Sequence, residues 1–332
     1  MAVTKTTDVI IPSLFSPYSI ERTAELSDIL QSGAVDRNPA FDALANGGGS
    51  VIDMPYWKEI TGDSKLIDQS APGVPQPITT GSDKAAFFNR FEAWGKSVLA
   101  QWASGADPVA VIADMVAGYW GRAFKRILLK ILDGLFDNTN GVLRTTHRVN
   151  IYTDVASPAV TAQLTGSTFV DGTLRLGDHS PEIFAVLMHG DVEGALRKQE
   201  LIQYVQPAGA VGRRIPTFQD RNVIVSDDCP KVAGTNSAAY HSYLFGRGAF
   251  GHGVQTNDPE DATEVGRVAL AHETHLVSRR RFILHPRGVK WSGSAAAAAG
   301  PSDAELATGT NWTKVYTDKN IRIVAIKHNI AP

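Results

Sequence analysis

The sequence predicts an α+β protein that relies on copies of itself for part of its packing. Strand-like and helix-like segments are mixed without a regular βαβ order, which favours α+β over α/β. One predicted helix is far longer than the average globular helix of about 12 residues. Extended apolar segments near the N-terminus have no obvious neighbouring segment to cover them. Together these observations indicate a chain whose projecting parts pack on something outside it.

The composition excludes several classes of protein. The 332 residues are 43% hydrophobic and 20% charged, which is ordinary for a globular chain of one or two domains. Lys and Arg number 32 against 34 Asp and Glu, so no strong net field favours nucleic acid or an anionic membrane. The single cysteine, Cys229, excludes an intrachain disulfide. Charged residues interrupt 109–136, the most apolar helical stretch, and no targeting segment is visible, so we expect a soluble protein.

The N-terminal third is predicted to project from the body. Residues 8–45 form an apolar arm with a short helix, and residues 51–60 and 85–99 form the two strands of a ribbon around the Pro- and Gly-rich segment 61–83. An isolated two-stranded ribbon is marginally stable in water, so it needs a surface to lie on. We expect its apolar side chains to pack on another copy of the chain, namely Trp57, Phe87, Phe88 and Phe91.

The clearest local signal is a long helix over 107–137. Asp107 is a suitable N-cap, and Pro108 suits the first helical position. Apolar pairs then recur every four residues up to Leu135 and Phe136, which predicts a helix of about 30 residues and about 45 Å. Further strands are expected at 183–188, 214–225, 239–245, 276–284 and 311–330, with a helix at 191–204.

Two motifs could carry chemistry, and both are better explained structurally. Gly246–Gly251 matches G-x-G-x-x-G, but turn-forming residues follow where a dinucleotide site needs a helix, so we expect a glycine-rich connection between strands. His272 and His275 fall one residue short of the H-E-x-x-H spacing, and zinc would need a third ligand. The residues therefore indicate no catalytic, cofactor-binding or metal-binding site.

Six segments resemble the major capsid proteins of tailed bacteriophages, in the gp13-like branch that shares the Hong Kong 97-type fold. They run in order along most of the chain: 9–35, 47–60, 215–230, 243–253, 279–291 and 311–330. The resemblance implies a division of the chain into an N-arm (1–46), an E-loop (47–100), a peripheral domain with a spine helix (101–182, helix 107–137), an axial domain (183–260) and return strands of the peripheral domain (261–332).

The resemblance also implies a function and a set of partners. The chain would be a structural protein whose pentamers and hexamers close an icosahedral shell around double-stranded DNA, touched on the inner face without sequence specificity. Because about 46 residues precede the ribbon, a separate scaffolding protein is expected, together with a portal, a possible decoration protein, and assembly in the host cytoplasm. An encapsulin-like compartment of the same fold is the first alternative, and a nucleotide- or metal-dependent enzyme is the second.

Overall fold

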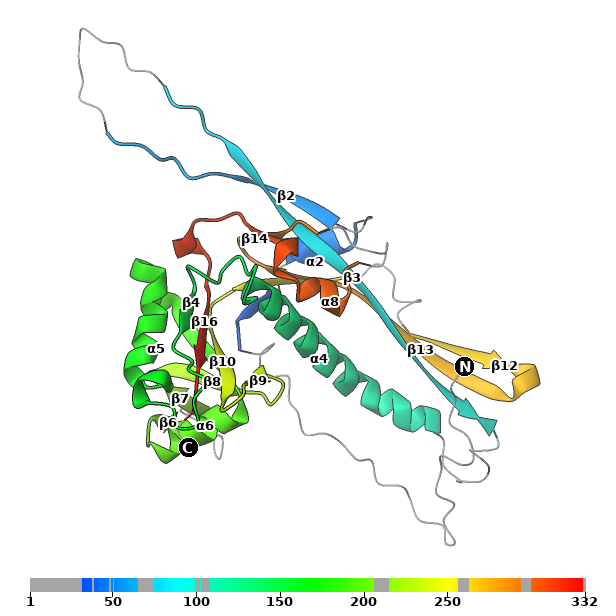
Figure 1. Ribbon diagram of the computed structural model, residues 1–332. Helices are drawn as coiled ribbons and strands as arrows, with labels where there is room; N and C mark the ends of the chain where they lie inside the picture. The colour runs from blue at the N-terminus through cyan, green and yellow to red at the C-terminus, as the bar shows by residue number, and fades with distance from the viewer. Residues whose placement is uncertain are drawn as a thin grey trace.

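The computed structural model describes residues 32–37, 39–47, 49, 51–64, 75–98, 102, 108–205, 215–255, 263–293 and 300–330. The predicted arm helix, the Asp107 cap and the ribbon tip at 65–74 lie outside these residues. Two large sheets and one long helix, α4 (Pro108–Leu135), organise the described chain (Figure 1). The shorter helices are α2 (Pro39–Ala45), α5 (Gly166–Thr173), α6 (Gly190–Lys198) and α8 (Asp303–Leu306), and the 3₁₀ turns are η2 (Val160–Ala162), η3 (Leu174–Glu182), η4 (Ala269–Ala271), η5 (Gly309–Asn311) and η6 (Asp318–Asn320).

The first sheet contains the predicted ribbon and extends it with strands from late in the chain. Its order is β1-β11-β13-β3-β2, and β12 pairs with the far part of β13. Strand β3 pairs with β13 all the way from Phe87–Ile283 to Ser97–Glu273. The chain therefore supplies part of the support that we expected from another copy. The bounds are β1 (Val35–Arg37), β2 (Val51–Trp57), β3 (Thr80–Ser97), β11 (Phe250–Val254), β12 (Thr263–Val268) and β13 (Glu273–Pro286).

The second sheet has the order β4-β16-β10-β5-β8-β7-β6, with β9 paired to β10. Its central strand, β10, is buried along almost its whole length between β5 and β16. The bounds are β4 (Arg148–Asn150), β5 (Ile183–Met188), β6 (Ile202–Val205), β7 (Ile215–Phe218), β8 (Arg221–Val225), β9 (Lys231–Ala233), β10 (Ala238–Gly246) and β16 (Ile323–His328). A small third sheet joins β14 (Val289–Trp291) to β15 (Trp312–Lys314).

The sheets divide the chain differently from the expected domain boundaries. Strands β4 and β16 come from outside 183–260, yet both belong to the second sheet. Strand β11 comes from inside that range, yet it pairs with β1 and β13 of the first sheet. The change of sheet occurs at the turn after β10, where Gly248 has a φ of +61°. A left-handed residue allows the sharp change of direction that sends the chain from one sheet to the other.

Helix α4 is buried against both sheets, as its predicted length and apolar pattern required. Near its middle Trp120 Nε1 donates to Ser278 Oγ at 3.0 Å, and the Phe124 ring packs 5.2 Å from that of Phe282 in the first sheet. Just past its end Phe136 packs against Tyr243 of the second sheet. One apolar cluster thus runs from the first sheet through α4 to the second. The helix therefore fixes the position of the two sheets relative to each other.

Gly134 marks the tightest contact of α4. A Cβ atom there would overlap the carbonyl oxygen of Leu306 and lie 2.7 Å from Trp312 Nε1. We therefore expect Gly134→Ala to destabilise the subunit by about 1–3 kcal/mol, although alanine favours an exposed helix interior by up to about 1 kcal/mol. Gly118→Ala is the matched control, because its Cβ would meet nothing closer than the flexible Arg122 side chain at 3.5 Å. In urea unfolding, Gly134→Ala should lower the free energy of unfolding and Gly118→Ala should raise it. A higher free energy of unfolding for Gly134→Ala would contradict this packing.

Two buried histidines lie in the second sheet. His328 of β16 is fully buried, and its Nε2 is 2.9 Å from Ser242 Oγ on β10. His241 of β10 is 8% exposed. The pKa of each imidazole is lowered to about 4, by burial in His328 and by burial together with the charges of Lys327 and Arg148 in His241. Both side chains are therefore neutral in the folded protein at neutral pH.

We expect the free energy of unfolding to fall as the pH drops from about 6.5 toward 4. The unfolded chain takes up protons near pH 6.5, whereas the folded chain resists them until about pH 4. By linkage this removes about 2 kcal/mol per histidine at pH 5. We expect His241→Gln to lose less unfolding free energy than the unaltered chain when urea unfolding is compared at pH 7 and pH 5. The difference should be about 2 kcal/mol, the contribution of one histidine. An unchanged slope in that variant would show that His241 is not held neutral.

Candidate inter-subunit surface

The four aromatic residues predicted to contact another copy separate into two pairs. Trp57, at the end of β2, and Phe91, in the middle of β3, are each 72% exposed. Trp57 pairs with Thr80 in the ribbon register, an odd number of residues from Phe91 along β3. Because side chains alternate along a strand, these two aromatic rings belong to opposite faces. They are separate contact points rather than one apolar stripe.

Phe87 and Phe88 correct the expectation, because both are buried within their own chain. Phe87 is 0% exposed and belongs to a cluster with Ala45 of α2 and Ile283 of β13. Phe88 is 1% exposed and stacks on Phe282, in the cluster that includes α4. Adjacent strand residues point to opposite faces, so this part of β3 is covered on both sides. Neither ring is available to a second subunit.

A buried hydrogen bond between a histidine and an aspartate fixes the base of the ribbon. His285 of β13 and Asp83 of β3 lie 2.9 Å apart between Nε2 and Oδ2, with side chains 3% and 5% exposed. Next to them, the Tyr56 hydroxyl donates to the Val315 carbonyl at 3.3 Å, and the Tyr56 ring meets that of Tyr316 edge-on at 5.0 Å. Burial, and then the Asp83 charge, raises the pKa of both tyrosines. The ribbon therefore leaves the body at a fixed place.

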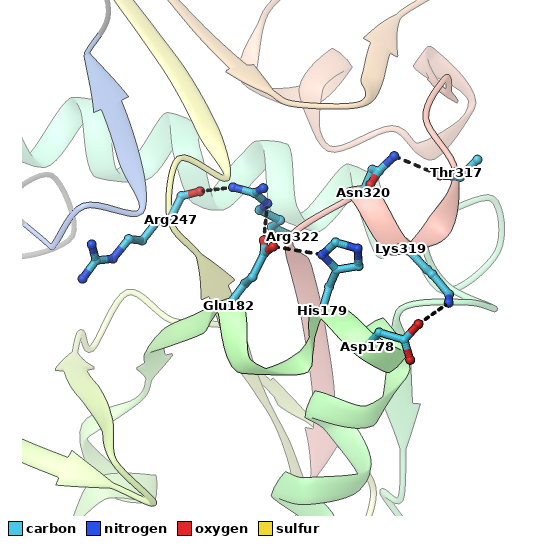
Figure 2. Close-up of polar contacts among 8 residues, drawn as sticks. All are labelled: Asp178, His179, Glu182, Arg247, Thr317, Lys319, Asn320 and Arg322. Atoms are coloured by element: carbon cyan, nitrogen blue, oxygen red, sulfur yellow. Dashed lines mark hydrogen bonds and ion pairs between the residues drawn. The ribbon is translucent and has the colours of Figure 1, made fainter. Parts of the chain in front are cut away.

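A polar cluster ties together three chain segments near that base (Figure 2). Glu182, at the end of η3, accepts from His179 Nδ1 at 2.9 Å and pairs with Arg322 Nε at 2.7 Å. Arg322 also donates to the Arg247 carbonyl at 3.1 Å, at the turn that joins the two sheets. The hydrogen bond from His179 and the Arg322 charge lower the pKa of Glu182. Because these groups are largely exposed, they orient the turn more than they stabilise it.

The same cluster borders a cleft of about 930 Å³ between the ribbon and the body. Its walls include Trp57 and Lys58 from the ribbon side and His179, Asn320 and Arg322 from the body. Beside it, Lys319 pairs with Asp178 at 2.9 Å (Figure 2). The arrangement combines apolar and charged groups in an open cleft, as at a protein contact rather than a reaction centre.

The glycine-rich motif and the histidine pair considered in the sequence analysis both lie in turns and strands of the fold. Gly246–Gly251 spans the end of β10, a turn and the start of β11, and no helix follows in the described chain, as expected for a strand connection. His272 ends the η4 turn with a φ of +53°, and His275 lies on β13, so the two histidines do not share a helix. Among the described residues, no three His, Cys, Asp or Glu side chains are grouped to hold a metal ion. No described helix is long and apolar enough to cross a membrane.

Comparison with known proteins shows what such a chain resembles. The sequence model of the Gp13-like family, described as major capsid protein 13-like, matches residues 137–321. The chain is also 40% identical over 333 residues to the major capsid protein of Bacillus phage SPP1, covering 99% of both chains. The chain belongs to the Gp13-like family of major capsid proteins. The resemblance inferred from the six sequence segments is thereby confirmed.

Solved structures agree on the fold of this Gp13-like protein. The capsid of Ralstonia phage GP4 matches with a TM-score of 0.64 at 10% identity, over 97% of this chain and 96% of that chain. The cyanophage Pam1 capsid matches with a TM-score of 0.60 at 9% identity, over 96% and 97%. The capsid fold predicted from the sequence is confirmed. This Gp13-like chain is a structural, shell-forming protein of the phage virion and not an enzyme.

The buried Asp83–His285 hydrogen bond at the ribbon base gives a direct test of how the ribbon is anchored. Asp83→Ala leaves the buried His285 without its partner, so we expect about 3 kcal/mol of destabilisation of the unassembled subunit. Asp53→Ala is the control, because its pair with Lys84 on the same ribbon is exposed and should change stability by less than about 0.5 kcal/mol. Equal effects in urea unfolding would contradict a structural role for the buried pair.

Proposed function

We propose that this chain is the major capsid subunit of a tailed phage, with pentamers and hexamers that close an icosahedral shell around double-stranded DNA. A separate scaffolding protein, a portal and, in some particles, a decoration protein are the proposed partners, with assembly in the host cytoplasm. In this proposal the ribbon lies on a neighbouring subunit. The DNA contacts the inner face without sequence specificity, in keeping with the formal net charge of −2.

The observation that carries the proposal is the exposure of large apolar side chains on a firmly anchored projection. On the ribbon Trp57 exposes 72% of its surface, and Ile60 and Ile78 further along expose 78% and 58%; Phe91, on the part of β3 that pairs with β13, also exposes 72%. Burying such side chains stabilises an interface, and aromatic residues dominate binding energies. Because the ribbon base is held by buried contacts, the subunit can present these residues without prior refolding.

We expect Trp57→Ser and Phe91→Ser to give folded subunits that assemble poorly. Losing one buried aromatic ring should raise the concentration needed for shell formation by about tenfold or more. Val160→Ser is the control, because Val160 is 68% exposed but lies away from the ribbon. Sedimentation and negative-stain microscopy measure the shells, and circular dichroism confirms the fold. Normal shells from Trp57→Ser would refute a role for the ribbon in assembly, and normal shells from Phe91→Ser would refute a role for the exposed face of β3 beside β13.

A ribbon deletion extends the same test. Residues 80–83 belong to β3, and Asp83 is buried, so the cut must spare them. Replacing 61–77 with two glycines keeps the base intact and should abolish shells while leaving the subunit folded. DNA recovered from shells of infected cells, rather than packaged protein cargo, would separate a phage capsid from an encapsulin-like compartment.

A further inference from the structure

Strand β3 has an open edge beyond the start of β2. Strand β2 covers one side of β3 over 80–86, whereas β13 covers the other side over 87–97. The side of 87–97 that faces away from β13 therefore has no paired strand in the described chain. An edge of this kind presents a row of main-chain N–H and C=O groups, which is a template for another strand.

Two main-chain hydrogen bonds show which residues of β3 face the open side. Val98 N–H donates to the His272 carbonyl at 2.9 Å, so the even-numbered residues of β3 exchange hydrogen bonds with β13. Lys58 N–H donates to the Thr79 carbonyl at 2.9 Å, so the odd-numbered residues face the side of β2. Beyond the start of β2, the main-chain groups of the odd-numbered residues therefore point to the open edge.

The open main-chain groups belong to Asn89, Phe91 and Ala93. Ala93 N–H donates to Glu92 Oε1 at 3.2 Å, as expected for a group that points away from β13. The main-chain groups of Asn89 and Phe91 have no hydrogen-bond partner among the described residues. The Phe91 ring, 72% exposed, stands at the same place. An added strand would thus find both hydrogen-bonding groups and apolar surface.

The open segment is bounded at both ends, and Phe91 is its central residue. At one end a Cβ atom on Gly300 would overlap the carbonyl oxygen of Phe87, so the chain passes against the edge there. At the other end Gly95 is buried. The residues between these positions leave room for an added strand of about five residues, or about 17 Å. Such a strand would be centred on Phe91.

The outer edge of β2 differs, because it carries Pro55. The even-numbered residues of β2 pair with β3, so Pro55 faces outward. Proline has no N–H to offer and is typical of edges that do not accept another strand. The open segment of β3 contains no proline. The sequence therefore protects one edge of this sheet and leaves the other able to pair.

We propose that the open edge of β3 pairs antiparallel with the same edge of a second copy of the chain, with Phe91 of one copy opposite Phe91 of the other. Asn89 of each copy then exchanges hydrogen bonds with Ala93 of the other. The first sheets of the two copies continue as one sheet across a two-fold axis. The inference rests on the proposed shell assembly. It names a contact between neighbouring rings, because contacts within a ring of five or six copies are heterologous.

The charges of β3 select this register and favour a second copy as the occupant. With Phe91 opposite Phe91, Arg90 of each copy stands opposite Glu92 of the other. Opposite charges facing across two strands are stabilising. A slip of two residues in either direction would place Glu92 opposite Glu92 or Arg90 opposite Arg90, and like charges directly opposite are destabilising. The edge is thus complementary to itself in the register that its open segment allows.

Both charged side chains retain hydrogen-bonding capacity for this contact. Arg90 Nη2 donates to the Pro301 carbonyl at 2.9 Å and to Asp303 Oδ1 at 2.8 Å, and the other guanidinium donors have no partner among the described residues. Glu92 Oε2 accepts the Tyr119 hydroxyl at 3.0 Å, and a carboxylate oxygen accepts more than one hydrogen bond. Being two residues apart, the two side chains lie on the same face of β3.

Hydrogen exchange at single-residue resolution tests the contact in the unaltered chain. We expect the amides of Asn89 and Phe91 to exchange about tenfold or more slowly in purified shells than in the unassembled subunit. The amides of Arg90 and Glu92 are the internal control, because they bond to β13 and should be protected in both states. Slow exchange of Asn89 and Phe91 in the unassembled subunit would show that the chain covers its own edge. Rapid exchange in shells would show an edge that stays open, and either result overturns the inference.

A proline tests the main-chain pairing. We expect Ala93→Pro to reduce shell yield by about tenfold, because it removes an N–H from the proposed contact. Circular dichroism should show a folded subunit, since that N–H does not bond to β13. Ala93→Ser keeps the N–H, and its shell yield should stay within about twofold of the unaltered chain. Equal yields from a folded Ala93→Pro and Ala93→Ser would contradict strand pairing.

A cysteine at the two-fold centre tests the register. In Phe91→Cys the two Cα atoms would lie about 5.5 Å apart, within the range of a disulfide. Ala93→Cys is the matched control, because the two Cα atoms at position 93 would lie about 14 Å apart. Cys229 does not interfere, since it is 2% exposed and burial raises the pKa of its thiol.

After oxidation of shells with diamide, we expect at least about tenfold more cross-linked dimer from Phe91→Cys than from Ala93→Cys. Equal yields overturn the proposed register. Protected amides in unaltered shells without a cross-link at position 91 would show that another strand occupies the edge, which also overturns the inference. If Phe91→Cys forms too few shells, hydrogen exchange in the unaltered chain decides. Failure of the unaltered chain to form shells would instead refute the proposed function.

Discussion

The pairing of β3 with β13 is the constraint on which the rest of the chain depends. These strands are distant in sequence, yet they share the longest pairing in the described structure. In the middle of it, Phe87 and Phe88 are buried on opposite faces, one beneath α2 and the other toward α4. Being covered on both faces, this stretch is fixed, and the elements at its ends project from a rigid base. The ribbon leaves at one end and the β12–β13 hairpin extends toward the other (Figure 1).

Helix α4 connects this fixed part of the first sheet to the second sheet, because it packs on both. Its middle turns contact β3 and β13, and Phe136, just beyond its end, contacts Tyr243 on β10. Long helices curve gently, but sharp kinks occur mainly at proline, and the only proline of α4 stands at its first position. A force on the ribbon or on the second sheet therefore acts on the helix between them. Such coupling suits a shell, where each subunit must keep its shape while neighbours press on several sides.

The surfaces left exposed are those that a shell would cover. Trp57 is exposed on the ribbon, Phe91 is exposed on the part of β3 that pairs with β13, and Leu270, at the tip of the β12–β13 hairpin, is 99% exposed. In the proposed shell, burying such apolar area against neighbouring copies would stabilise the contacts between subunits.

The local sequence pattern was sufficient to predict an element wherever residues close together in the chain determine its structure. The repeat of apolar pairs predicted α4, and the turn-formers after Gly251 predicted a strand connection rather than a nucleotide site. The six segments that resemble capsid proteins predicted the family. Each depends on residues close together in the chain, where helix periodicity and turn preferences act directly.

Tertiary structure alone decided which apolar residues remain free. Phe87 and Phe91 look alike in the sequence, but only Phe87 lies beneath α2, which comes from another part of the chain. The Asp83–His285 pair likewise joins residues that are about 200 positions apart in the sequence. Burial is a property of the surroundings and not of the residue, so no local pattern contains it.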